Sequence, residues 1–322
     1  LKERTIEGKK AYKSILDIEG PVDVAVIVIP APAVSKVLEE CGEKGIKNAI
    51  IISAGFSEAE KEGDKREGEI EKIAQKHDIH ILGPNCLGLI NKNQKLNATF
   101  AHTDIENIAS GKEQGKIAFI SQSGAIGSSI LDWSQSKNFG LSYFVSLGNK
   151  AGVGENELLE YFLEDKNAEV IALYLEEITQ GKKFMEAASK LAKKKPVIVL
   201  KAGMTSAGNQ ASLSHTGSIG GSREAVLAGL KRSGAMIAGS LEEFLELLEL
   251  WGKKKDAVSG DIHLVSNAGG PAVVAMDEVS QAGLRAGKLT SSTKQELSRE
   301  LPSVVLPANP LDIIGDADAA RY

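Results

Sequence analysis

The α/β character of this chain is clearest in Lys116-Ile-Ala-Phe-Ile120, which runs directly into Ser121-Gln-Ser-Gly-Ala-Ile-Gly127. A short apolar run of this kind is typical of a strand that is buried on both faces of a parallel sheet. The small polar residues after it are typical of a turn, and a helix-periodic stretch follows them. The segment therefore predicts a strand, a tight turn and a helix, which is the repeating unit of an α/β fold.

The same unit recurs along the chain. Buried strands are predicted at Val22–Ile29, Ala49–Ile52, Ile79–Leu82, Ile117–Ile120, Val170–Leu175, Val197–Leu200 and Ile262–Val265. Amphipathic stretches between them predict helices over Ala33–Lys44, Glu58–His77, Ile126–Lys137, Lys182–Lys194, Ser218–Arg232 and Leu241–Trp251. Strands that alternate with helices of this length predict doubly wound parallel sheets flanked by helices.

The length of 322 residues is about twice that of a usual domain, so two or three α/β domains are expected. Polar stretches rich in Gly and Lys at Ser110–Gly115 and Lys253–Gly260 predict boundaries between three pieces. The chain begins with Leu1 rather than Met, and its last stretch, Asp316–Tyr322, carries no turn or cap in what should be the middle of a domain. Both ends are therefore expected to be truncated.

The composition is that of an ordinary soluble protein, with 42% hydrophobic and 25% charged residues and a net charge of −5 spread along the chain. Neither nucleic-acid binding nor membrane binding is expected. No apolar run approaches the roughly 20 residues that cross a bilayer, and the start lacks the pattern of a secretion signal, so a cytoplasmic location is expected. Cys41 and Cys86 show no disulfide framework or metal-ligand spacing, so both are expected to be reduced packing residues, and no metal site is predicted.

Two strand-to-helix turns share a pattern of small polar residues. Ser121, Ser123 and Gly124 form one candidate anion site, because the unpaired N–H groups and the positive dipole of a helix N-terminus attract phosphate. Asn267, Gly269 and Gly270 form the second. Glycine in such a turn also serves tight packing of the helix on its sheet, so each turn alone is weak evidence. Two such turns in one chain favour phosphate binding.

One histidine lies among small residues, in Ser212-Leu-Ser-His-Thr-Gly-Ser-Ile-Gly-Gly221. Small neighbours leave the imidazole of His215 uncrowded. An imidazole can accept a phosphoryl group on one nitrogen when a carboxylate or carbonyl holds the other nitrogen, so His215 needs an acid nearby. The alternative is that His215 caps the following helix or faces water. Its surroundings favour the phosphoryl carrier.

Five motifs occur together and in order: Gly83-Pro-Asn-Cys-Leu-Gly88, Ser121-Gln-Ser-Gly124, Glu176-Glu-Ile178, Ser214-His-Thr-Gly217 and Asn267-Ala-Gly-Gly-Pro271. With these motifs the chain resembles the α-type subunits of ADP-forming acetyl-CoA synthetases, relatives of succinyl-CoA synthetase. The resemblance spans essentially the whole chain. It implies a Rossmann-like CoA-binding domain over residues 1–110, a flavodoxin-like ligase domain with the phosphohistidine loop over residues 111–256, and the start of a second flavodoxin-like ligase domain over residues 257–322.

The resemblance also implies roles for individual residues. His215 carries the phosphate, and Glu177 steadies the imidazole, with Glu176 beside it as the alternative. Two helix N-termini bind the phosphate, one near CoA and one near the nucleotide; they match Ser121, Gln122, Ser123 and Gly124, and Asn267, Ala268, Gly269 and Gly270. The family's CoA and acyl contacts match Pro30, Ser53, Ala54, Gly55, Asn85 and Cys86, with Asn85 at the acyl carboxylate or acyl phosphate.

The implied reaction converts acetyl-CoA, ADP and inorganic phosphate reversibly into acetate, CoA and ATP through an acyl phosphate and a phosphohistidine. The family's opening strand and Gly-rich loop, which bind the nucleotide end of CoA, are not found before Leu1. No ATP-grasp domain is found either. The resemblance therefore places the nucleotide and Mg²⁺ on an ATP-grasp β subunit or a fused segment, in an assembly of the α2β2 type, and the chain alone is not expected to turn over.

Three other functions compete with this interpretation. One is a CoA- or nucleotide-sensing regulatory domain of a protein lysine acetyltransferase, whose members often lack the histidine that this chain has. Another is a succinyl-CoA synthetase-like ligase acting on a different acyl group. A nicotinamide-dependent dehydrogenase is disfavoured, because no Gly-x-Gly-x-x-Gly follows a first strand.

Overall fold

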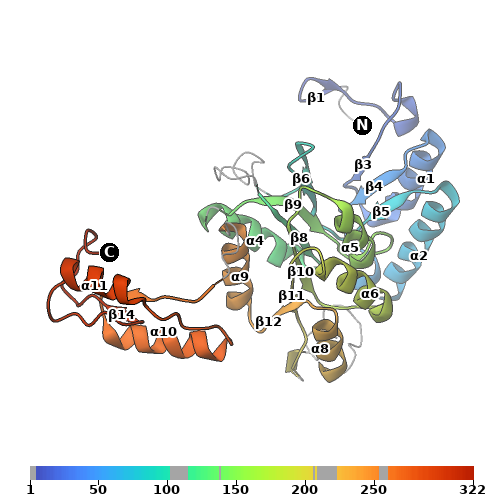
Figure 1. The fold of residues 1–322 in the computed structure, drawn as a ribbon. Coiled ribbons are helices and arrows are strands. Elements are labelled where there is room, and N and C mark those ends of the chain that lie inside the picture. The colour runs from blue at the N-terminus through green and yellow to red at the C-terminus, as the bar shows by residue number, and fades with distance from the viewer. Residues whose placement is uncertain (1–4, 102–114, 138, 206, 209–222, 254–259) are drawn as a thin grey trace. The chain divides into compact units, whose positions relative to one another are not determined.

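The computed structural model describes residues 5–101, 115–137, 139–205, 207–208, 223–253 and 260–322. The chain divides into two compact units, Leu1–Lys254 and Lys255–Tyr322, and each is described by itself. Figure 1 shows helices on both faces of the large central sheet of the first unit. No helix within the described ranges combines the length and the apolar composition that crossing a membrane would require.

The first unit begins with a small parallel sheet. Its strands are β3 (Ala25–Ile27), β4 (Asn48–Ile51) and β5 (His80–Leu82), in chain order. The connecting helices α1 (Val34–Lys44) and α2 (Glu60–His77) pack together against this sheet. Helix α1 buries Val34, Leu38 and Cys41, the three- and four-residue spacing of an amphipathic stripe. A short hairpin precedes the sheet. Its strands, β1 (Thr5–Ile6) and β2 (Lys9–Lys10), have two residues each.

A seven-stranded sheet forms the centre of the same unit. In space its strands follow the order β12-β11-β10-β8-β9-β6-β7. Their bounds are β6 (Gly88–Asn91), β7 (Leu96–Thr99), β8 (Ile117–Ser121), β9 (Leu141–Ser146), β10 (Val170–Leu175), β11 (Val197–Lys201) and β12 (Met236–Ala238). Strands β8 to β12 are parallel, and counted along the chain they lie in the order 2-1-3-4-5 of a doubly wound sheet.

Helices cover both faces of this sheet, and each face has its own core. One core contains Phe162 and Phe184 from α5 (Glu155–Glu164) and α6 (Gly181–Ala192), with Leu230 from α8 (Arg223–Arg232). The other contains side chains of α4 (Gly124–Lys137) and α9 (Leu241–Lys253). Neighbouring strands β8 and β10 therefore lead into helices on opposite faces. This is the switch point at which doubly wound sheets bind ligands.

The expected fold class, α/β with parallel sheets flanked by helices, is confirmed. Six of the seven predicted strands and all six predicted helices form at or near their predicted positions, although the first five residues of the helix predicted at Ser218–Arg232 lie outside the described residues. The seventh strand is shorter than predicted: only β13 (Val265–Ser266) forms, and Ile262 makes an isolated bridge to Ala286.

An antiparallel hairpin is absent from the sequence-based expectations. Strands β6 and β7 pair with each other, and β6 pairs antiparallel with β9, so the central sheet is mixed at one edge. The hairpin belongs to residues 1–110 of the predicted domain scheme, yet it extends the sheet built by the following residues. Short edge strands bury few side chains and carry a weak periodic signal, which explains why the sequence did not reveal them. The domain boundaries themselves stay a prediction.

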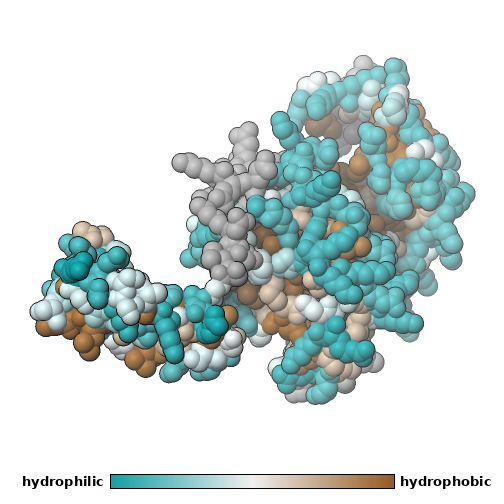
Figure 2. All heavy atoms as spheres, viewed as in Figure 1, coloured by the Kyte–Doolittle hydropathy of each residue, from teal (hydrophilic) through white to brown (hydrophobic). Residues whose placement is uncertain are grey.

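The second unit pairs β13 with β14 (Leu311–Asp312) and adds α10 (Gly269–Gln281) and α11 (Ser291–Glu300). Its buried core is small and consists of Val305, Leu311 and Ile313. Several large apolar side chains of this unit are exposed, and brown atoms gather along one edge of it in Figure 2. By contrast, hydrophilic residues dominate the visible face of the first unit. The second unit thus buries a smaller part of its apolar surface.

Candidate functional site

Polar side chains line a cavity of about 140 Å³ in the first unit. They come from the turns that follow β4, β5, β8, β9 and β10, so both sheets contribute their carboxyl ends. The lining residues are Ser57, Glu58, Asn85, Gln122, Gly148, Asn149, Lys150, Glu176 and Glu177. Three of the predicted site residues, Asn85, Gln122 and Glu177, are therefore brought together. The cavity lies at the switch point between β8 and β10, the usual ligand position in such sheets.

The segment after β9 joins the two sheets and forms one wall of the cavity. The amide of Leu147 donates to Ser121 in the second sheet (2.8 Å), and the amide of Asn149 donates to the carbonyl of Pro84 at the end of the first (2.9 Å). The amide of Ala151 donates to Gly83 (3.0 Å). These bonds hold the Gly83–Gly88 loop against the second sheet, which explains how Asn85 reaches a cavity that is also lined by residues after β8 and β10.

Asn149 is the centre of a polar cluster at the first-sheet side. Its side-chain nitrogen lies 3.0 Å from the hydroxyl of Ser57 and 2.6 Å from the Glu58 carboxylate, and its oxygen accepts a hydrogen bond from Asn85 (3.2 Å). Burial raises the pKa of Glu58, but the bonds from Asn149 and from the backbone of Gly55 and Phe56 outweigh it, so the pKa is lowered overall. Glu58 is therefore ionised at neutral pH, and Asn149 fixes the side chain of Asn85.

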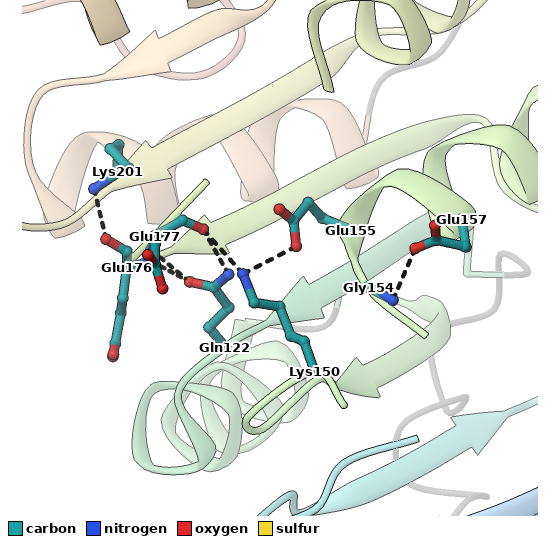
Figure 3. A network of polar contacts seen from close by, with 8 residues as sticks. All are labelled: Gln122, Lys150, Gly154, Glu155, Glu157, Glu176, Glu177 and Lys201. Carbon is teal, nitrogen blue, oxygen red and sulfur yellow. Dashed lines mark hydrogen bonds and ion pairs between the residues drawn. The ribbon is translucent and has the colours of Figure 1, made fainter. Parts of the chain in front are cut away.

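The opposite wall contains the backbone of Glu176 and Glu177, held by the side chain of Gln122 (Figure 3). The amide oxygen of Gln122 accepts hydrogen bonds from the N–H groups of both glutamates, at 2.8 Å for Glu177. Its amide nitrogen donates to the carbonyl of Glu177 (2.8 Å). The side chain of Gln122 thus contacts the segment that carries the predicted acid, and its expected contact with phosphate stays a prediction.

Two lysines bind the same segment. The ammonium of Lys150 donates to the carbonyl of Glu177 (3.2 Å), and that of Lys201 donates to the carbonyl of Glu176 (2.7 Å). Lys150 also forms an ion pair with Glu155 (3.3 Å), whose side chain is only 3% exposed. Burial lowers the pKa of Lys201, and the nearby ammonium of Lys150 adds to this, while the carboxylates of Glu176 and Glu177 act in the opposite direction.

The two neighbouring carboxylates have different surroundings. Glu176 forms a hydrogen bond with the hydroxyl of Tyr174, and burial together with this carboxylate raises the pKa of Tyr174 to about 12. Within the described residues, no hydrogen bond or ion pair reaches the carboxylate of Glu177. Glu177 is half-buried and lines the cavity, so its carboxylate is available to a group that enters there.

The two predicted phosphate turns have the same internal hydrogen bonds. At the first turn the hydroxyl of Ser121 donates to the carbonyl of Ser123 (2.7 Å) and accepts from its amide (3.2 Å). At the second turn Ser266 makes the same two bonds with Ala268, at 2.8 and 3.1 Å. In each case the bonded turn leads directly into a long helix. The similarity seen in the sequence is thus a similarity of backbone structure.

The remaining predicted CoA contacts lie at the carboxyl ends of β3 and β4. The hydroxyl of Ser53 is bound to the backbone of Ile29, accepting from its amide at 3.0 Å. Pro30 and Ala54 are exposed, and Gly55 has a left-handed φ of 103°. None of these residues lines the polar cavity. Their contacts with CoA stay a prediction.

Cys86 is buried beneath the cavity, and its thiol lies 3.4 Å from the carbonyl of Ile51. Cys41 is buried in the core between α1 and the first sheet. Burial raises the pKa of each thiol to about 11. Both cysteines are free, and the loop contributes Asn85 rather than Cys86 to the cavity.

These thiols are expected to react slowly in the folded protein. Only the thiolate reacts, so a pKa near 11 instead of 9.0 lowers the reactive fraction at pH 8 by about 100-fold, and burial slows the reaction further. The native protein should label with a disulfide reagent far more slowly than the protein in guanidinium, with the rate rising as the pH approaches 11. Rapid labelling of the native protein, suppressed by CoA, would contradict this expectation. It would show that Cys86 is accessible to the ligand.

The remaining predicted site residues belong to the histidine loop and to the second unit. His215 and its loop lie outside the described residues. Asn267, Ala268, Gly269 and Gly270 belong to the second unit, where the amide of Asn267 donates to the hydroxyl of Tyr322 (2.9 Å) and Gly269 begins α10. Among the described residues, no group of three or more His, Cys, Asp or Glu side chains is arranged to hold a metal ion.

Sequence reasoning missed the residues Gly148, Asn149 and Lys150. They follow β9, a strand that the sequence analysis did not predict, so their polar turn was not predicted as a strand end. The run Leu141–Ser146 is interrupted by two serines and a tyrosine, and the small polar turn Gly-Asn-Lys150 after it is the signal that could have revealed the strand end. Lys201 directly follows the predicted strand Val197–Leu200 and was not among the predicted site residues. Its contact with Glu176 depends on the pairing of β10 with β11.

Two family models match the chain: a CoA binding domain over residues 1–92 and a succinyl-CoA ligase like flavodoxin domain over residues 114–251. The alpha subunit of the ADP-forming acetate–CoA ligase II of Pyrococcus furiosus is 40% identical over 322 residues, which cover 100% of this chain and 68% of that subunit. The ADP-forming acetate–CoA ligase I of Archaeoglobus fulgidus is 42% identical over 321 residues, 100% of this chain and 46% of that protein.

A solved structure is also similar. The dinucleotide-forming acetyl-coenzyme A synthetase 1 of Ca. Korarchaeum cryptofilum, in complex with phosphate and ADP, superposes with a TM-score of 0.89 at 35% identity. The match covers 98% of this chain and 66% of that chain. The chain thus spans about half the length of the A. fulgidus relative and about two thirds of the other two proteins.

Proposed function

The chain belongs to the family of ADP-forming acetate–CoA ligases, and on that basis we propose that it carries the acyl-transfer and phosphohistidine half of such an enzyme. The complete enzyme converts an acyl-CoA, ADP and inorganic phosphate reversibly into a carboxylate, CoA and ATP. The nucleotide and its Mg²⁺ bind to an ATP-grasp partner, either a separate β subunit in an α2β2 assembly or a fused domain. The location that suits this metabolic role is the cytoplasm.

The chemistry proceeds in three transfers. An oxygen of inorganic phosphate attacks the thioester carbonyl, the C–S bond breaks, and CoA leaves as a thiolate that takes up a proton. A ring nitrogen of His215 then attacks the phosphorus of the acyl phosphate, and the carboxylate departs. Finally the phosphoryl group passes from His215 to ADP. Glu177 holds the second ring nitrogen of His215 and stabilises the positive charge that develops on the imidazole.

The observation that carries this proposal is the meeting of Asn85, Gln122 and Glu177 around one cavity at a sheet switch point. Asn85 comes from the part of the chain that matches the CoA binding domain, and the other two come from the part that matches the ligase domain. An acyl group held by Asn85 would thus lie close to Glu177, the acid that steadies His215. A positive group that suits a phosphate is present as well, namely the N-terminus of α4, which follows Gln122.

The character of the cavity supports a short acyl group, with acetate as the first candidate. Its lining consists of polar side chains and Gly148, and its volume is about 140 Å³. A long or aromatic acyl chain would bury apolar surface against these polar groups and leave their hydrogen bonds unmade, which costs free energy. Among acyl-CoA substrates supplied to the complete enzyme, acetyl-CoA is therefore expected to react faster than a long-chain or aryl-CoA.

The direct test supplies the chain and its nucleotide-binding partner with acetyl-CoA, ADP, Mg²⁺ and phosphate and measures ATP. We expect ATP to form only when every component is present. In the reverse direction, labelled ATP should give a phosphoprotein whose label is lost in acid and kept in base. The chain without its partner is the control and should not turn over. Tight binding of CoA with no ATP from any acyl-CoA would contradict the proposal and favour the regulatory domain.

A further inference from the structure

Side chains from the ends of β8 and β11 and from the turn after β9 hold the backbone of Glu176 and Glu177, and we propose that Gln122, Lys150 and Lys201 are positioning residues that set the direction of the Glu177 carboxylate. The set Gln122, Lys150 and Lys201 is called the clamp below. This inference rests on the proposed function, since it assigns the clamp a part in the phosphoryl transfer through Glu177.

The clamp provides a hydrogen-bond partner for each backbone N–H and carbonyl group of Glu176 and Glu177. Both N–H groups donate to the amide oxygen of Gln122. The carbonyl of Glu176 accepts from Lys201 (2.7 Å), and the carbonyl of Glu177 accepts from Gln122 (2.8 Å) and Lys150 (3.2 Å). All four backbone polar groups of the two glutamates therefore have a side-chain partner, as the dashed lines in Figure 3 show.

The position of the clamp follows from the strand order. Strand β10 lies between β8 and β11, and Gln122 follows β8 while Lys201 ends β11. The ladder of parallel hydrogen bonds ends at Leu175, whose carbonyl accepts from the amide of Ala202 (2.8 Å). Beyond that point the clamp side chains replace the missing backbone partners on both sides. The backbone of the dipeptide is thus hydrogen-bonded on both sides beyond the end of the strand.

Lys150 is itself held in place at a conformational cost. Its φ of 66° is left-handed, a region that costs a residue with a side chain about 1–2 kcal/mol. The ion pair with Glu155 lies in the interior, with the two side chains 12% and 3% exposed. Strained backbone and a buried ion pair persist where the surrounding structure requires them, and such features concentrate at functional sites. Here they direct one ammonium to the Glu177 carbonyl.

A fixed backbone matters because, among the described residues, no hydrogen bond or ion pair holds the Glu177 carboxylate itself. With the backbone held, the carboxylate can move only through its own side-chain torsions, so less conformational entropy is lost when it binds a ring nitrogen. A misplacement of about 1 Å can lower the rate of a transfer reaction by about 100-fold. The clamp therefore contributes to the rate through Glu177, without contacting the substrate itself.

The test is a double-mutant cycle in the complete enzyme, measured as the single-turnover rate of His215 phosphorylation. We expect Gln122→Leu to lower this rate by about 10- to 100-fold, with little change in the Kd of CoA. In the Glu177→Gln background the same substitution should lower the rate by less than about 3-fold, because the clamp acts through a carboxylate that is already gone. Lys201→Met should show the same dependence on Glu177, and the exposed Gln75→Leu on α2 is the matched control.

A second measurement observes the clamp without reference to activity. Amide hydrogen exchange over residues 170–180 should be faster in Gln122→Leu than in the wild type, because the N–H groups of Glu176 and Glu177 lose their acceptor. Equal losses of rate in the Glu177 and Glu177→Gln backgrounds, or unchanged exchange, would overturn the inference while the proposed function stands. A wild-type enzyme that never phosphorylates His215 would overturn the proposed function and this inference together.

Discussion

Replacing His215 by asparagine is expected to abolish phosphoryl transfer in the complete enzyme. Asparagine keeps a polar side chain of similar reach but has no nitrogen that can accept a phosphoryl group at neutral pH. Turnover should fall by about 10³-fold or more, the scale seen when a covalent nucleophile is removed from other enzymes. The acid-labile label transferred from ATP to the protein should disappear. The measurement is the radioactivity that remains on the protein after treatment with base.

The remaining half-reaction distinguishes a lost carrier from a misfolded protein. The exchange of phosphate and CoA between acyl-CoA and acyl phosphate precedes His215 in the proposed sequence, so the variant should retain it. Thermal unfolding should also stay close to that of the wild type. Label that survives in His215→Asn would show that another residue carries the phosphate and would remove the mechanism proposed for this chain.

Replacing Gly148 by alanine is expected to cause the largest loss of stability among the substitutions at the cavity. A Cβ at this position would lie 2.1 Å from the carbonyl oxygen of Pro84 and 2.7 Å from that of Asn85. The Pro84 oxygen accepts a hydrogen bond from the Asn149 amide, so it cannot move away without breaking that bond. The φ of 59° adds about 1–2 kcal/mol for a residue with a side chain. We expect the free energy of unfolding to fall by about 3 kcal/mol or more.

Urea unfolding measures this loss, and Gly68→Ala in α2 is the matched control. A Cβ at Gly68 meets no atom within 4 Å, and the residue lies inside a regular helix. Alanine there should raise the free energy of unfolding by about 0.5–1 kcal/mol. Activity of Gly148→Ala should fall as well, since the displaced loop carries Asn85. Unchanged stability would mean that the segment after β9 does not join the two sheets in solution.

The central parallel strands β8, β10 and β11 were readable from local pattern. The runs at Ile117–Ile120, Val170–Leu175 and Val197–Leu200 are buried on nearly all sides, and a fully buried strand leaves a continuous apolar signal. The hairpin β6–β7 left no such signal, because it lies at an edge and exposes part of its side chains. Strand β9 is fully buried, yet its serines and tyrosine interrupt the apolar run. Their hydroxyls find partners only in the folded protein, as Ser146 does with the amide of Leu87 (2.9 Å).

The candidate site was predicted in part. The Ser-Gln-Ser-Gly turn and the Glu-Glu pair were identified from motif and resemblance, and the structure brings Gln122 and Glu177 together. The contacts of the Gln122 side chain with the backbone of Glu176 and Glu177 were not predicted. A glutamine in this turn could serve either to bind phosphate or to hold a backbone segment, and the sequence does not distinguish the two. Asn149 was not foreseen either. Its partners Ser57, Glu58 and Asn85 lie more than sixty positions away along the chain, and no local pattern records such contacts.

By itself the sequence determined where the continuous apolar strands and six of the helices form, because burial on both faces and the chemistry of small turn residues leave local signals. It also determined the repeated turn, whose hydroxyl bonds at Ser121 and Ser266 each span two residues. Only the tertiary structure decided which turns meet. The placement of β8 between β9 and β10 brings Lys150, Gln122 and Glu177 to one edge of the sheet, and strand order depends on contacts between segments far apart in the chain.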